Sequence, residues 1–506
     1  MGNKMGANCG SQLPFIKKIK TRNHNYIYEV NSNNLIRVNQ IIYDLIDGFG
    51  KSSPDSLVDK FKHRYNPADI LRYYESIKKV KDEQNLFSAN RPVINSGFRS
   101  EEDIKYILDS NLNQIILELT ARCNHRCKYC PFSGRYTHKR QHEERDMTLD
   151  IAKKSVEYFI ARTNTNKKEM KPAITFYGGE PLLRFDLIKE IVELTKRSGV
   201  SNEYRFSLTT NGTLLTDEVI KYFVENDISI LVSLDGPKKI HDLYRVFSNG
   251  QGTFDAIQKN LKRIKKCNPE YFENNISFNA VVTPPYDFDS IIQFFYRRTF
   301  FKPFKDKIRV NFVDAYHTSF FRDFNLEREN TLLNTELNRL LNRYKKALID
   351  GSHEKLTIER QLFLDNFYTI AMRPIAPLEK KYPPIGTCIP GQRRLFVDTV
   401  GKFFMCEKVG SNYEIGNADK GFNYQVIYDF YLEYDDFFQD CKYCWALRLC
   451  KKCFNSIRKG ADFDDQRKKE MCKKKLKVIE DNLIIYCEIL ERKPDAFKVY
   501  ESIEMS

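Results

Sequence analysis

The 506-residue sequence contains no apolar run long enough to span a membrane, which takes about 20 residues. It also has no internal repeat and no low-complexity segment. The segment from Met1 to Phe15 is polar, so it lacks the apolar stretch of a signal peptide. A myristoylation signal has Ser or Thr where this chain has Gly6. We therefore expect a cytoplasmic protein without a membrane partner.

Acidic residues are the minority charge, since 82 Lys and Arg stand against 67 Asp and Glu, giving +15 and a pI near 9.0. This balance is typical either of a nucleic-acid-binding protein or of a Lys-rich solvated surface. The lysines are scattered over helical segments such as Met471–Lys477, and the aromatic-plus-basic signature of a nucleic-acid module is missing. We favour the solvated surface, and nucleic acid is not an expected partner.

A chain of this length is too long for one compact core, so several domains are expected. Residues 1–23 are predicted to be an N-terminal extension and residues 24–98 a small module. The module begins with two alternating segments that predict a hairpin, Tyr26–Val30 and Leu35–Val38. Three helical patterns follow, and two of them begin with a cap residue before proline: Gln40–Gly48, Ser53–Tyr65 and Pro67–Val80. Two strands with three short helices predict a winged-helix module.

Strand-like apolar runs alternate with helical patterns over residues 112–320. Six such runs occur: Gln114–Leu119, Ala173–Tyr177, Tyr204–Leu208, Ile228–Leu234, Ile276–Val282 and Ile308–Val313. Six βα units predict an α/β fold, a parallel sheet curled into a partial (β/α)₆ TIM-like barrel. Ligands gather at the C-terminal ends of the strands in such barrels. A helical linker (321–385), a cysteine-rich iron–sulfur domain (386–475) and a C-terminal helix (476–506) complete the predicted organisation.

Thirteen cysteines in a chain without a secretion signal are unlike a disulfide framework. Cys123, Cys127 and Cys130 follow the first barrel strand. Three thiolates in eight residues can hold three irons of a cubane cluster and leave the fourth iron open. The alternative is a zinc site, which needs a fourth ligand from His125, His138 or His142. The spacing is unusual for a zinc ribbon, so we favour the cluster.

Seven further cysteines lie between residues 388 and 472, and they also indicate metal: Cys388, Cys406, Cys441, Cys444, Cys450, Cys453 and Cys472. Two zinc sites are the alternative to iron–sulfur clusters for this group. The remaining cysteines, Cys9, Cys267 and Cys487, belong to no motif and are interpreted as ordinary thiols.

The Cys-x₃-Cys-x₂-Cys motif after the first strand, with Gly178-Gly179-Glu180-Pro181 after the second, resembles the radical S-adenosylmethionine (SAM) superfamily. The resemblance implies that SAM chelates the open iron of a [4Fe–4S] cluster and is cleaved reductively to a 5′-deoxyadenosyl radical. The electron would come from a donor such as flavodoxin or ferredoxin. The alternative interpretation of the SAM-binding residues that follow is that they are ordinary turn residues and surface charges. The implied SAM-binding residues are Tyr129, Gly178, Gly179, Glu180, Thr210, Asn211, Ser233 and Arg245.

The second cysteine group resembles the SPASM domain, which carries auxiliary [4Fe–4S] clusters in radical SAM peptide maturases. The resemblance implies one cluster on Cys441, Cys444, Cys450 and Cys472, and a second on Cys388, Cys406 and Cys453, hence three clusters in all. Seven thiolates leave the second cluster with an open iron or a non-cysteine ligand. The chain departs from the family in having two residues, not three, between Cys450 and Cys453.

Glu407 directly follows Cys406. Sulfatase maturases have an acidic residue at this position that is thought to accept the substrate's proton, so Glu407 is the candidate catalytic base. A solvated carboxylate that balances Lys408 is the alternative interpretation.

The N-terminal module resembles the element that binds leader peptides in enzymes that modify ribosomally made peptides. Such elements add the leader as a β-strand on an exposed edge, and Leu35–Val38 is the candidate edge. The leading hypothesis is a maturase that crosslinks a leader-bearing precursor peptide, through a thioether first and through carbon–carbon or carbon–oxygen bonds next. Two alternatives stay open. One is an anaerobic sulfatase-maturating enzyme that forms formylglycine, and the other is a zinc-binding winged-helix DNA regulator.

Overall fold

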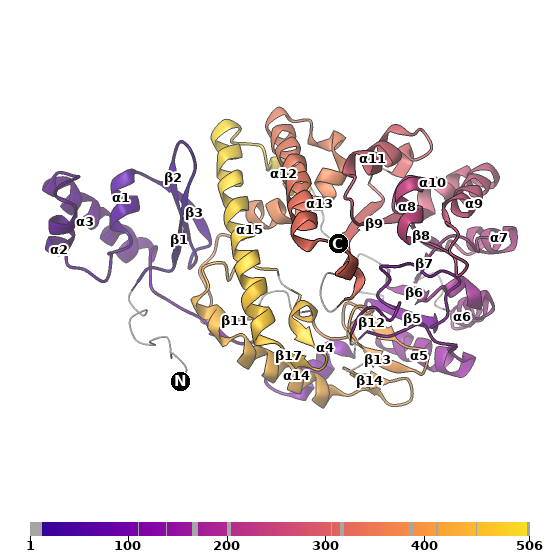
Figure 1. Cartoon of the computed structure of the whole chain (residues 1–506). Coiled ribbons are helices and arrows are strands. Elements are labelled where there is room, and N and C mark those ends of the chain that lie inside the picture. Colours follow the sequence, from indigo (N-terminus) through magenta and orange to yellow (C-terminus); the bar gives the residue numbers. More distant parts are fainter. Residues whose placement is uncertain are drawn as a thin grey trace.

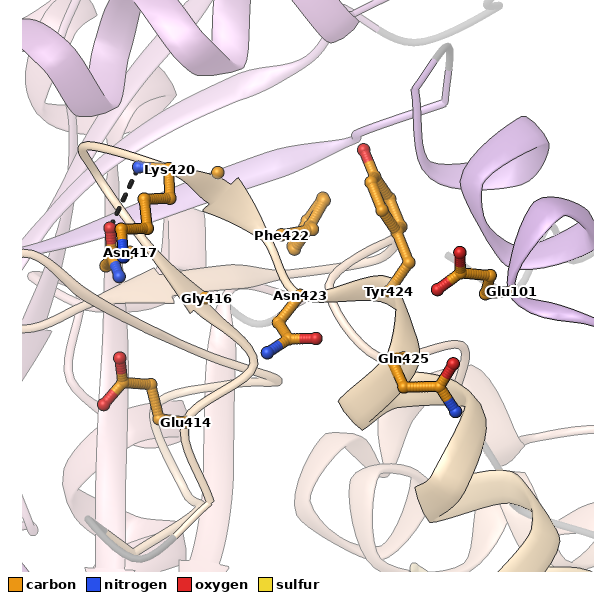
Figure 2. A pocket seen from close by; sticks show the side chains of 10 residues that line it. Glu101, Glu414, Gly416, Asn417, Lys420, Phe422, Asn423, Tyr424 and Gln425 are labelled. Carbon is orange, nitrogen blue, oxygen red and sulfur yellow. Dashed lines mark hydrogen bonds between the residues drawn. The ribbon is translucent and has the colours of Figure 1, made fainter.

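The computed structural model describes residues 13–109, 111–137, 139–163, 171–199, 204–304, 306–313, 318–384, 388–410, 413–451 and 453–502. Cys9 and His138 lie outside these ranges. The N-terminal module stands at one end of the molecule, the barrel at the other, and the long C-terminal helix between them (Figure 1). None of the described helices combines the length and apolarity needed to cross a membrane.

The barrel is confirmed as six parallel strands that are neighbours in chain order. The first, second and fourth of these strands are nearly continuous apolar runs, as expected of strands covered on both faces, whereas the other three alternate polar and apolar residues. They are β5 (Gln114–Thr120), β6 (Ala173–Gly178), β7 (Arg205–Thr210), β8 (Ser229–Ser233), β9 (Ile276–Val282) and β10 (Ile308–Phe312). The intervening helices are α5 (Leu149–Arg162), α6 (Phe185–Arg197), α7 (Asp217–Glu225), α8 (Lys238–Tyr244), α9 (Phe254–Cys267), α10 (Pro269–Asn275) and α11 (Phe288–Ile292).

The cysteine-rich segment extends the barrel sheet beyond its first strand. β12 (Leu395–Val397) pairs parallel with β5, so that Phe396 lies opposite Ile116. Three short antiparallel strands continue the sheet: β13 (Lys402–Phe404), β14 (Gly416–Asn417) and β15 (Gly421–Phe422). The cysteine-rich segment and the barrel therefore share one sheet of ten strands.

The N-terminal module has a three-stranded antiparallel sheet in the order β1-β2-β3. Its elements are β1 (Ile16–Lys20), β2 (Asn25–Glu29), β3 (Asn34–Val38), α1 (Gln40–Leu45), α2 (Pro54–Phe61) and α3 (Pro67–Gln84). Ser53 and Asn66 cap α2 and α3, each followed by proline, as predicted. β3 is an edge strand, which confirms that expectation, whereas β1 was not predicted. The winged-helix identity stays a prediction.

The remaining helices pack between the module and the barrel. They are α4 (Glu101–Leu108), α12 (Leu326–Asp350), α13 (Thr357–Ala371), α14 (Tyr424–Phe437) and α15 (Asp465–Arg492). Two pairs of two-residue strands lie outside the larger sheets: β4 (Val93–Ile94) with β11 (Lys381–Tyr382), and β16 (Arg458–Lys459) with β17 (Asp462–Phe463) as a hairpin. α15 begins earlier than the predicted C-terminal helix and contains Cys472.

The module is tied to α15 by side-chain contacts. Glu491 of α15 accepts hydrogen bonds from the hydroxyls of Thr21 (2.6 Å) and Tyr26 (3.0 Å) and from the amide of Asn23 (3.1 Å). Lys17 forms an ion pair with Glu480, 2.9 Å apart. The module is thus positioned against the body of the protein.

Candidate active site

The first cysteine group lies at the C-terminal end of β5, beside the glycine motif that ends β6. The backbone N–H of Gly179 donates to the carbonyl of Thr120 at 2.8 Å, and that of Glu180 to the carbonyl of Arg122 at 2.9 Å. A Cβ atom at Gly178 or Gly179 would overlap these same carbonyl groups. Only glycine permits this approach, so the glycine motif sets the position of the cysteine loop.

The cysteines of the first group are half-buried, and backbone donors approach two of their sulfurs. Backbone N–H groups of His125 and Phe132 lie 3.4 Å from the sulfurs of Cys123 and Cys130, respectively. Burial raises the pKa of both thiols to about 12. The charge of Cys127 raises both pKa values further, which shows that the three sulfurs are close together. Three thiolates so placed need a bound cation to stay ionised, which fits an iron–sulfur cluster.

The two described imidazoles that could serve as zinc ligands differ in what they contact. His125 directs Nε2 to the Thr213 hydroxyl at 3.2 Å, whereas Nε2 of His142 lies 3.7 Å from the sulfur of Cys130. Within the described ranges, no three His, Cys, Asp or Glu side chains converge closely enough for a single metal ion.

Glu180 joins the ends of β6 and β7. Its fully buried carboxylate accepts hydrogen bonds from the Thr210 hydroxyl at 2.7 Å and the backbone N–H of Asn211 at 2.8 Å. The Asn211 amide in turn donates to Asn124 within the cysteine motif at 2.7 Å. Burial raises the pKa of Glu180 to about 7. Predicted pocket residues from two strand ends therefore meet beside the cysteines.

Arg245 and Tyr129 meet at Asp235, a residue whose role was not predicted. Arg245 Nε donates to Asp235 Oδ2 at 3.0 Å, and the Tyr129 hydroxyl donates to the same oxygen. Arg245 also lies 3.9 Å from the sulfur of Cys127 through Nη1. Ser233, at the end of β8, is buried nearby in the chain. Asp235 is two residues after Ser233, a predicted SAM-binding residue, so its position in the sequence could have drawn attention to it.

The second cysteine group separates into two sets. Burial raises the pKa of Cys441 to about 12 and that of Cys444 to about 11, and the charge of Cys472 adds to both; Cys450 adds to Cys444. In the other set, burial raises the pKa of Cys453, and the charge of Cys388 adds to it. The pKa of Cys406 is about 11 because of burial, with a contribution from Cys453. The structure thus brings the predicted members of each set near one another, and their roles as cluster ligands stay predictions.

Glu407 lies between the second set and the barrel. Its side chain is 15% exposed and pairs with Arg394 Nη1 at 2.7 Å, which does not fit a solvated partner of Lys408. Its other oxygen, Oε2, is buried without a hydrogen-bond partner among the described residues. Burial and then the charge of Glu407 raise the pKa of Tyr177 on β6. The Tyr177 ring packs against Phe132, two residues after Cys130.

Sequence reasoning missed Arg140, which links these regions. Its guanidinium donates to the carbonyl of Glu407 at 3.0 Å and lies 3.5 Å from the Glu118 carboxylate of β5. It also covers the ring of Phe396 on β12 at 3.9 Å. Arg140 follows the cysteine motif in a loop with no regular pattern, so no sequence signal marked it. Of the cysteines without a motif, Cys267 is exposed and Cys487 is buried.

Comparisons with known proteins assign part of this chain to a family. Residues 117–295 match the model of the Radical SAM superfamily. The cysteine-type anaerobic sulfatase-maturating enzyme of Clostridium novyi is 30% identical over 38% of this chain and 49% of its own. The radical SAM cyclopropyl synthase TigE of Paramaledivibacter caminithermalis is 25% identical over 61% of this chain and 60% of its own.

The structure of native anSMEcpe with bound AdoMet superposes with a TM-score of 0.54 at 19% identity, over 77% of this chain and all of that one, which shows a shared fold. The chain spans 49% and 60% of the length of these two curated relatives. The cysteine loop at the end of β5, the glycine motif that fixes its position and the family match all indicate the same kind of domain. Residues 117–295 therefore form a radical SAM domain, an enzymatic domain of a superfamily whose cofactors are SAM and a [4Fe–4S] cluster.

Proposed function

We propose that this protein is a peptide maturase with one catalytic and two auxiliary [4Fe–4S] clusters. When bound, SAM and the catalytic cluster supply a 5′-deoxyadenosyl radical that removes a hydrogen atom from the substrate. Cys123, Cys127 and Cys130 would hold the catalytic cluster. The observation that carries the proposal is the separation of the other seven cysteines into two sets beside the barrel, with Glu407 between the second set and the barrel.

The residues around the proposed SAM pocket bind and orient. Glu180 and the backbone of Gly178 and Gly179 would receive the amino group of SAM, since a buried carboxylate beside exposed backbone suits an ammonium ion. Arg245 and Ser233 would receive its carboxylate, with Asp235 holding Arg245 in place. Tyr129 would lie along the adenine, and Thr210 and Asn211 would line the pocket.

Glu407 is the proposed base. Its free oxygen Oε2 can accept a proton from a substrate group, while Arg394 holds the other oxygen. A thiol or hydroxyl that loses its proton in this way would bond to, or be oxidised at, the carbon that lost its hydrogen atom, and the proposed auxiliary clusters would accept the one electron that this step releases. An electron donor such as flavodoxin or ferredoxin would supply the electron that SAM cleavage consumes.

The substrate that we propose is a ribosomally made precursor peptide with a leader. The proposed product carries a crosslink, and a thioether is the first choice for its bond. The edge strand β3 supports this choice, because an exposed edge can pair with an extended leader. Formylglycine formation is the second candidate, favoured by the similarity to sulfatase-maturating enzymes of Clostridium novyi and Bacteroides thetaiotaomicron. Hydrazide reagents distinguish the two products, because they capture the formylglycine aldehyde and leave a crosslink unmodified.

Iron content and SAM cleavage test the proposal together. The reconstituted protein should hold about twelve irons, or somewhat fewer, as three cubanes require. Cys127→Ala should lose the catalytic cluster and release no 5′-deoxyadenosine from SAM under dithionite. Cys453→Ala is the matched control, which should lose iron only from the auxiliary set and still cleave SAM. A colourless zinc protein, or full SAM cleavage by Cys127→Ala, would overturn the proposal.

A further inference from the structure

A small apolar groove opens at the C-terminal ends of β9 and β10, the same end of the barrel that carries the cysteine loop. Its volume is about 90 Å³. Its walls include the last residues of the two strands, Val282 and Phe312, together with Phe321 and Leu333. Phe312 is 40% exposed, although it is a large apolar side chain. The groove therefore presents apolar surface to solvent at the active end of the barrel.

Aromatic rings connect the groove to the proposed SAM pocket. Phe321 packs on Phe320, with ring centres 4.8 Å apart. Phe320 packs on Tyr244 at 5.4 Å and on Tyr129 at 6.4 Å. Tyr129 stands between the second and third cysteines of the catalytic motif. Phe321 and Phe320 thus separate the groove from Tyr129 in the proposed SAM pocket. A peptide could place one side chain in the groove while a neighbouring residue reacts.

One carboxylate lies among the apolar walls. Glu329, in the first turn of α12, lines the groove, and its Oε2 is buried without a hydrogen-bond partner among the described residues. Together with burial, its charge raises the pKa of Tyr244 and that of Tyr286, the latter to about 12. The side chain as a whole is half-buried, and a cation with its own donors would supply the hydrogen bond that Oε2 lacks.

We propose that this groove is a subsite for a basic side chain of the substrate peptide, with lysine as the best fit. Lysine has an apolar stem that can lie along Phe312 and Leu333 and an ammonium head that can donate to Glu329 Oε2. The inference rests on the proposed peptide substrate and adds a residue preference to it. It places a basic residue near the residue that loses hydrogen.

Small probes test the subsite without knowledge of the natural substrate. Saturation-transfer NMR on the reconstituted full chain would compare N-acetyl-lysine methylamide with N-acetyl-norleucine methylamide, which has nearly the same stem and no charge. We expect the lysine probe to bind about tenfold more tightly, as for a charged hydrogen bond. Glu329→Gln should abolish the preference. Glu327→Gln, in the same helical turn but outside the groove, should retain it.

Phe312→Ser should weaken the binding of both probes by shortening the apolar wall. Equal binding of the two probes to the wild type, no binding of either, or equal losses in Glu327→Gln and Glu329→Gln would each overturn the subsite. The 5′-deoxyadenosine released by the wild-type preparation tests the proposed function separately. A preparation that cleaves SAM but shows no lysine preference therefore rejects the subsite alone.

Discussion

Gly179 controls how closely two loops of the catalytic end approach each other. An added methyl group would overlap the Arg122 carbonyl, directly before Cys123. We predict that Gly179→Ala shifts the cysteine loop, lowers iron at the catalytic site and reduces 5′-deoxyadenosine release at least tenfold. Gly250→Ala is the control for backbone strain without overlap, since Gly250 has a φ of +82° and no atom lies within 4 Å of an added Cβ there. Iron analysis and product quantification check both variants, and normal iron content in Gly179→Ala would refute the prediction.

Glu118 should make stability depend on pH. Burial raises the pKa of this carboxyl from 4.5 to about 7, although Arg140 lowers it. Between these values the folded state binds the proton more strongly than the unfolded state, so the free energy of unfolding falls as pH rises. The full effect is at most about 3 kcal/mol.

The Glu118→Gln variant removes this dependence. We expect its free energy of unfolding, relative to wild type, to increase from pH 4.5 to pH 7. Urea unfolding at several pH values measures the difference, and Glu144→Gln, at an exposed position, is the control. Parallel pH profiles of Glu118→Gln and wild type would show that Glu118 titrates normally.

At this scale the sequence predicted residues that sit in short motifs and missed those that act through contacts. The cysteines and Glu180 were identified because their spacing is specific. Arg140 was missed because it lies in an irregular loop, and its partners Glu118 and Phe396 are distant in sequence. Asp235 lies two residues after Ser233, but its contact with Arg245 depends on how the end of β8 and the end of α8 come together.

Among the elements, β3 offers a direct test of leader binding. In an antiparallel edge strand, the N–H groups of successive residues point alternately toward the partner strand and away from it. Of Ile36→Pro and Arg37→Pro, one therefore removes an N–H that faces the free edge, and the other removes a bond to β2. We predict that the variant that loses the N–H at the free edge weakens precursor-peptide binding at least tenfold while the module stays folded.

Fluorescence polarisation with the labelled precursor peptide, and thermal melts of both variants, measure the two effects. Only the variant that breaks the bond to β2 should melt earlier. Tight peptide binding by both folded variants would argue against strand addition at β3.

The predicted elements differ from the observed ones where strands are short. The six barrel strands were found because each is a run of five to seven apolar-rich residues. Two-residue strands such as β14 and β15 have no readable period, and their pairing depends on the sharp turn between Gly416 and Gly421. β1 was missed because its sequence, IKKIK, alternates poorly.

For the molecule as a whole, the N-terminal module contacts the loop that carries the first auxiliary set. Arg448, between Cys444 and Cys450, donates to the carbonyls of Asn31 at 3.2 Å and Ala376 at 2.7 Å. Trp445 packs edge-on against Tyr28. Docking of the module and order of this cysteine loop are therefore linked.

We predict that Arg448→Ala speeds hydrogen exchange in residues 16–38 and lowers iron retention at the auxiliary set, while catalytic iron is kept. Lys442→Ala, whose Nζ lies over Tyr443 in the same segment, is the control. Hydrogen exchange read by mass spectrometry, together with iron counts, measures both effects. Unchanged exchange in residues 16–38 would show that the other contacts suffice.

The parallel pairing of β12 with β5 has a consequence for how the chain is made. Since β5 precedes β12 by most of the barrel in sequence, a growing polypeptide exposes one side of its first barrel strand until the ribosome reaches residue 397. A fragment that stops at residue 385 would keep that bare strand permanently, and bare strands invite aggregation. The barrel and its cysteine-rich partner thus have to be produced as a single piece.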